Sequence, residues 1–172
     1  MNNTHLHLVV NHLPIIFPIV GIIILLIGIL SKSEITNRNA YIIFILGAFA
    51  SIAAMATGEN AEEAIEKISG ISENMIKTHE ETSELFAGLS YVLGGFSLIS
   101  LFGSYKNFAV TKYFPFIVSI FAIVVLFFAQ KVGTSGGEIR HTEIRSGVTF
   151  QNDNQTEKNT ENDFKKSDED ND

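Results

Sequence analysis

The chain has 172 residues, of which 46% are hydrophobic and 18% are charged, and its formal net charge is −7. It contains no cysteine, which excludes disulfides, covalently attached c-type haem and thiolate-ligated iron–sulfur clusters. The charged residues almost completely avoid the apolar stretches, which sets this chain apart from a soluble all-helical domain.

Four apolar runs follow one another along the chain, at about residues 8–30, 40–57, 85–103 and 113–130. Each approaches the ~20 residues that an α-helix needs to cross a bilayer. We therefore predict an all-α integral membrane protein whose residues 1–146 form a four-span antiparallel helix bundle. The lipid bilayer is its first expected partner, and no nucleic acid is expected to bind.

The longest predicted loop, residues 58–84, is amphipathic. Apolar residues recur there at helical spacing, with acidic residues between them. This pattern predicts a loop helix that lies on the membrane surface or caps the bundle, with a break near Gly70. His79 lies three residues after Ile76 and is therefore aimed towards the end of the bundle.

The tail, residues 147–172, is polar and acidic, with Phe164 as the one aromatic residue of its last stretch. Such a segment buries too little apolar surface to offset its ordering entropy, so we predict a disordered acidic tail.

The positive charges predict the orientation. The short loops on the side away from the histidines hold Lys32, Arg38, Lys106 and Lys112 against the single acid Glu34. Because short basic loops face the cytoplasm, we expect a multi-pass protein of the bacterial inner (cytoplasmic) membrane. Both termini, the amphipathic loop helix and all histidines are then extracytoplasmic.

All five histidines are predicted to share one rim, because an even number of crossings returns the chain to its starting face. His5, His7 and His12 open the first span, His79 precedes the third, and His141 follows the fourth. Pro14 suits the first turn of a helix, which places the start of the regular span near Leu13. His12 is then at the interface, and His7 lies in a preceding segment able to fold back across the bundle mouth.

This rim has the residue types of a haem or metal site. A b-type haem requires two axial imidazoles, which His12 and His79 are best placed to supply, with His7 and His141 as supporting or additional ligands. Gly88, Gly94 and Gly95 provide either space for a porphyrin or close helix packing. A site for Fe, Cu or Zn is equally allowed by residue type. Its ligands would be His7, His12, His79 and His141 together with carboxylates from Glu59, Glu63, Glu80 and Glu138.

The two halves of the chain share a pattern. Each half enters a hairpin at a histidine, His12 or His79, and leaves it at a Gly-Glu, namely Gly58-Glu59 or Gly137-Glu138. An internal duplication with its axis along the membrane normal explains this pattern, and so does chance similarity between short apolar hairpins.

Four segments together resemble an uncharacterised bacterial family of four-span membrane proteins, a domain of unknown function. They are His7-Leu8-Val9-Val10-Asn11-His12-Leu13-Pro14-Ile15, Thr57-Gly58-Glu59-Asn60-Ala61-Glu62-Glu63, His79-Glu80-Glu81 and Gly136-Gly137-Glu138-Ile139-Arg140-His141. The resemblance covers about residues 6–145 and implies that His7, His12, His79 and His141 are the motif histidines, whereas His5 is not. Leu8 stands where the family has proline, and Leu13 where it has an aromatic residue.

The function we predict is binding of haem b or a transition metal ion at this rim, in a redox or metal-handling role with a redox or envelope protein partner. The alternative is a non-catalytic structural or accessory subunit of a larger cell-envelope membrane complex.

Overall fold

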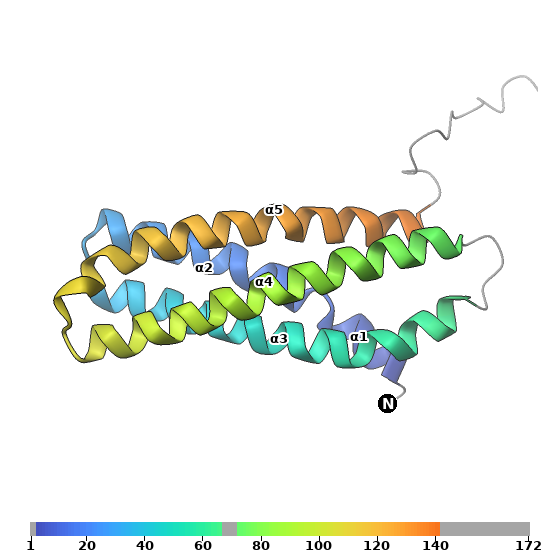
Figure 1. The fold of residues 1–172 in the computed structure, drawn as a ribbon, viewed down its shortest axis with the longest axis horizontal. Coiled ribbons are helices and arrows are strands. Elements are labelled where there is room, and N and C mark those ends of the chain that lie inside the picture. Colours follow the sequence, from blue (N-terminus) through green and yellow to red (C-terminus); the bar gives the residue numbers. More distant parts are fainter. Residues whose placement is uncertain (1–2, 67–71, 142–172) are drawn as a thin grey trace, which may run out of the picture. The chain divides into compact units, whose positions relative to one another are not determined.

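The computed structural model describes residues 3–66 and 72–141, which are almost entirely helical (Figure 1). The chain divides into two units, Met1–Arg140 and His141–Asp172. The elements of the first are α1 (Asn3–Val10), α2 (Leu13–Leu30), α3 (Glu34–Glu66), α4 (Glu73–Tyr105), the 3-10 helix η1 (Ala109–Tyr113) and α5 (Phe114–Arg140). The predicted acidic tail lies outside the described residues.

Four helical stretches are long and apolar enough to cross a membrane, as the sequence predicted. They are His5–Leu30, Glu34–Gly58, Glu73–Tyr105 and Ala109–Ile139. Large apolar side chains point outward from all four, among them Ile23, Phe49, Leu98 and Ile120. Water would penalise so much exposed apolar surface, whereas lipid does not. The protein is therefore a multi-pass helical membrane protein.

The core runs between α2, α3, α4 and α5. Each of these helices contacts its neighbour in the chain, α2 also contacts α5, and α1 contacts α3. The largest fully buried apolar side chains come from all four long helices: Leu25, Phe44, Leu93, Val118 and Val125. In Figure 1 the long helices lie side by side, and the end of α3 and the start of α4 lie at the same end as α1.

Glycines bring the helices together. A Cβ on Gly94 of α4 would overlap the Cβ of Ala48 on α3, and one on Gly21 of α2 would lie 2.6 Å from the Phe44 ring. Gly94 therefore serves close helix packing, one of the two uses the sequence left open. Gly88 and Gly95 differ, because a Cβ there would meet nothing within 4 Å.

Residues 58–84 do not form a separate loop helix in the described part of the chain. Their first part continues α3 to Glu66, and their second part, from Glu73, is the beginning of α4. The amphipathic pattern thus belongs to extensions of two spans. A helix that is already formed gains one hydrogen bond for each residue added, whereas a new helix needs its own nucleus. The predicted break near Gly70 lies outside the described residues.

The hairpin turns at the opposite end use the same helix-ending motif twice. Ser33 N–H donates to Gly28 O at 2.9 Å and Lys32 N–H to Ile29 O at 3.2 Å. Phe108 and Asn107 N–H repeat this pattern on Gly103 O and Ser104 O, at 3.2 and 3.3 Å. Lys32 and Asn107 take the left-handed conformation that this motif requires, with φ of 53° and 57°. Asparagine tolerates that conformation, but for lysine it costs about 1 kcal/mol relative to glycine.

Candidate ligand site at the histidine end

His7 reaches from α1 to the last turns of the α3 span. Its Nδ1 lies 3.1 Å from the Ala54 carbonyl oxygen and 3.0 Å from Thr57 Oγ1. A carbonyl oxygen only accepts, and the Thr57 hydroxyl already donates to Ala53 O at 2.9 Å. Nδ1 therefore carries the proton. In the neutral ring the lone pair is then on Nε2, the tautomer suited to binding a metal.

His79 is held in the same way between α4 and α5. Its Nδ1 lies 2.9 Å from Ser135 Oγ, and the Ser135 hydroxyl donates to Val132 O at 3.1 Å. A hydroxyl can accept from a ring nitrogen or donate to it, so this contact orients the His79 ring without fixing its tautomer.

A glycine lies against each ring. A Cβ on Gly58 would be 3.6 Å from His7 Cε1, and a Cβ on Gly136 would be 2.9 Å from His79 Cε1. The first distance is an ordinary contact, while the second is closer than real Cβ atoms approach. Gly136 therefore makes room for the His79 imidazole, and both rings are only partly exposed.

The two imidazoles belong to the same end of the long helices. His7 lies on α1 and His79 near the start of α4, and these parts lie at the same end in Figure 1. They are held by separate hairpins, since His7 is anchored on α3 and His79 on α5. The packing of the helices therefore brings to one end two imidazoles that are far apart in the sequence.

The other three histidines, His5, His12 and His141, are all exposed. His12 is exposed at the start of α2, which begins at Leu13 as predicted, and its side chain makes no capping hydrogen bond. His5 is exposed on α1. His141 is exposed, directly follows α5 and belongs to the second unit.

The predicted carboxylate ligands have different surroundings. Glu80 is exposed on α4, and Glu138 is partly buried on α5. Glu59 and Glu63 belong to α3, and their side chains are outside what is described. Among the residues that are described, no three His, Asp or Glu side chains gather closely enough to hold a metal ion.

The two halves share one arrangement at this end. His7 and His79 are each hydrogen-bonded to a hydroxyl, Thr57 or Ser135, that directly precedes the glycine packed against the same ring. In this arrangement the residue that corresponds to His79 is His7. Sequence reasoning missed Thr57 and Ser135, although a hydroxyl residue before glycine occurs at both hairpin exits.

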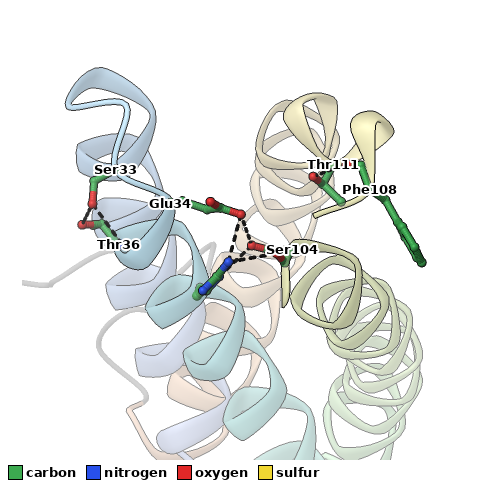
Figure 2. A network of polar contacts seen from close by, with 7 residues as sticks. Ser33, Glu34, Thr36, Ser104, Phe108 and Thr111 are labelled. Atoms are coloured by element: carbon green, nitrogen blue, oxygen red, sulfur yellow. Dashed lines mark hydrogen bonds and ion pairs between the residues drawn. The ribbon is translucent and has the colours of Figure 1, made fainter. Parts of the chain in front are cut away.

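A polar network at the opposite end also escaped the sequence analysis, although the i,i+4 spacing of Glu34 and Arg38 signals a helical ion pair. Arg38 lies 3.1 Å from the Glu34 carboxylate and donates to Ser104 Oγ at 2.8 Å. The Ser104 hydroxyl donates to the same Glu34 oxygen at 2.6 Å. Figure 2 shows this network linking the start of α3 to the end of α4.

Comparison with protein-family models, with curated proteins and with solved structures finds no match for this chain.

Proposed function

We propose that this chain binds haem b or a transition metal ion through His7 and His79, in a redox or metal-handling role at one membrane face. The observation that carries the proposal is the shared arrangement of two imidazoles at one end of the bundle. Each ring is hydrogen-bonded through Nδ1 to a protein oxygen, which orients the ring and assigns Nε2 as the ligand atom in this proposal.

We place haem b first because bis-imidazole haem needs two imidazole nitrogens, whereas structural zinc sites use four protein ligands and catalytic ones three. His7 and His79 would supply that pair, while the side chains of Glu59 and Glu63, which a metal site would add, lie outside what is described. When bound, the haem would supply one-electron chemistry. His7 and His79 would hold it, while Thr57 and Ser135 would orient the two rings.

This proposal changes the pair predicted from the sequence, which was His12 with His79. His12 is exposed and makes no capping hydrogen bond within the described residues, whereas the His7 ring is held by Ala54 and Thr57. We place His12, Glu80 and Glu138 outside the ligand pair. The resemblance to the four-span family is consistent with this assignment, because His7 and His79 both belong to the motifs that carry it.

The proposed setting is the bacterial inner membrane. The chain would form an antiparallel four-span bundle, with the basic Lys32 and Lys106 turns in the cytoplasm and the histidine end outside. A redox or envelope protein would dock at that end.

The test is the cofactor content of the full-length protein, purified in detergent, before and after incubation with hemin and with Fe, Cu or Zn. We expect stoichiometric binding by the natural protein, with a Soret band if haem is the ligand. His7→Ala and His79→Ala should each lower the affinity by more than about tenfold, since loss of a supporting residue alone costs ~10–100-fold.

His5→Ala and His12→Ala are the matched controls, because both side chains are exposed at the same end of the helices. Both variants should bind as much haem or metal as the natural protein does. Loss of the cofactor from His12→Ala, together with its retention in His7→Ala, would support the His12–His79 pair and contradict the His7–His79 pair. A natural protein that takes up neither haem nor metal, and that copurifies with a larger envelope complex, would support the accessory subunit instead.

A further inference from the structure

The end of the protein opposite the histidines contains a pocket of about 600 Å³ between the two hairpin turns. Its lining comes from the end of α2, the start of α3, the end of α4, η1 and the start of α5. The residues that define its character are Lys32, Asn37, Asn107, Phe108, Lys112 and Phe116. Because this pocket lies at the ends of four candidate spans, a lipid headgroup and the first part of its acyl chains can reach it.

The charge of this pocket is positive. Glu34 is the one acid that lines it, and its carboxylate is engaged by Arg38 at 3.1 Å and by the Ser104 hydroxyl at 2.6 Å. Lys32 and Lys112 also line the pocket, and both residues are exposed, with the Lys112 ammonium 5.0 Å from the centre of the Tyr113 ring. An anionic group placed there would lie near two lysines and a carboxylate that is already paired.

The turn geometry holds Lys32 at the pocket. Lys32 occupies the left-handed position that ends α2, where glycine would be relaxed, and Asn107 occupies the equivalent position at the end of α4. A lysine kept in this conformation places its long side chain at the junction of the two hairpins.

The remaining lining suits the other parts of a phospholipid. Ile29, Phe108, Pro115 and Phe116 give apolar surface for acyl chains. The Asn37 side-chain oxygen is buried against Gly28 of α2 and has no hydrogen-bond partner within the described part of the chain, so it is not a contact for the headgroup.

We propose that this pocket binds one anionic glycerophospholipid, with its phosphate between Lys32 and Lys112 and its acyl chains on the phenylalanines. This site is independent of the histidine pair.

The experiment titrates the purified full-length protein in a neutral detergent with dioctanoyl phosphatidylglycerol, dioctanoyl phosphatidylcholine and inorganic phosphate, following lipid adducts by native mass spectrometry and the unfolding midpoint. We expect phosphatidylglycerol to bind as a single adduct and to raise the midpoint, while the other two ligands do so only weakly. Equal effects of the two lipids would overturn the anion site. An equal effect of inorganic phosphate would identify a small-anion site and contradict the assignment of a lipid ligand.

Lys32→Gly is the decisive variant, because it removes the charge while relaxing the backbone, and so should fold at least as well as the natural protein. It should weaken phosphatidylglycerol binding roughly fivefold, the effect of one lysine near an anionic headgroup, and Lys112→Gln should do the same. Lys106→Gln is the control, since Lys106 lies at the same end but outside the pocket lining. Equal weakening by Lys106→Gln would show general surface attraction and overturn the site.

Discussion

At the residue scale, the proposed ligand site depends on which ring nitrogen of each histidine is hydrogen-bonded. For His7 the acceptor is a backbone carbonyl, which cannot donate, and for His79 the partner is the Ser135 hydroxyl, which also contacts Val132 O. A ring without such a contact would rotate and present either nitrogen. Thr57 and Ser135 therefore pre-organise the two imidazoles, and this lowers the entropy cost of binding a ligand.

Gly136 provides a test of that orientation. Gly136→Ala places a Cβ 2.9 Å from His79 Cε1, so the ring must shift and its bond to Ser135 must weaken. We expect the affinity for hemin or metal to fall about tenfold or more, as for the loss of an orienting partner. The measurement is the same cofactor titration, with helicity followed by circular dichroism.

Gly133→Ala is the matched control on the same helix, because its Cβ would meet nothing within 4 Å. It should leave cofactor binding unchanged and raise the free energy of unfolding by up to about 1 kcal/mol, the usual gain from replacing an interior helix glycine. Equal cofactor loss in both variants would contradict a specific role for Gly136.

At the scale of the helices, α3 and α4 are held together by close contact at small residues. Ser51 is buried on α3, and Ser90 and Ser100 are buried on α4. The hydroxyl of each donates to a carbonyl four residues earlier in its own helix, at 2.8–3.1 Å. These three serines thus add little bulk and satisfy their own hydroxyl donors, whereas the buried Ser97 hydroxyl on α4 has no hydrogen-bond partner within the described residues. The small side chains allow the backbones to approach.

Substitutions at two adjacent glycines distinguish the effect of helix packing on stability from the effect of helix propensity. Gly94→Ala would overlap Ala48, so we expect it to lower the free energy of unfolding by about 1–3 kcal/mol, the usual cost of overpacking. Gly95→Ala, one residue later and facing open space, should be neutral or stabilising. Thermal unfolding in one detergent compares the two variants. A Gly94→Ala protein as stable as Gly95→Ala would show that α3 and α4 are not packed closely at this point.

At the scale of the whole molecule, four candidate spans determine which loops share a membrane face. The histidine end and the basic turns are then on opposite faces whichever way the protein is inserted. A single cofactor at the proposed site on His7 and His79 would be able to exchange electrons with a partner at its own face. It cannot carry them across a ~30 Å hydrocarbon core.

Labelling of single cysteines tests the orientation, and the absence of natural cysteine makes each introduced thiol unique. A cysteine at Lys106, an exposed residue at the end of α4, should resist an impermeant thiol reagent in intact cells. A cysteine at Ser167 in the predicted tail should react. Permeabilised cells give the control, since both positions should then be labelled. The reverse pattern in intact cells would show that the protein has the opposite orientation, with the histidines still on one face of the membrane.

The sequence by itself determined the helical class, the existence of four membrane-crossing segments and the start of α2 at Leu13. These features depend on local sequence. The length of an apolar run and a proline in the first turn have the same effect whichever helices lie beside them. The same local rules located the candidate ligand residues at the ends of the predicted spans.

Which histidines are held against other helices, and by which contacts, follows only from the tertiary structure. His7 and Thr57 are 50 residues apart, and His79 and Ser135 are 56 apart, so each hydrogen bond exists only once the helices pack. Sequence spacing favoured His12 because it lies nearer to the span, but α1 packs on α3 and brings His7 to Thr57 instead. The pocket between the two hairpin turns likewise forms only when four helix ends meet. Such contacts depend on the register of separate helices, which no local pattern in the sequence fixes.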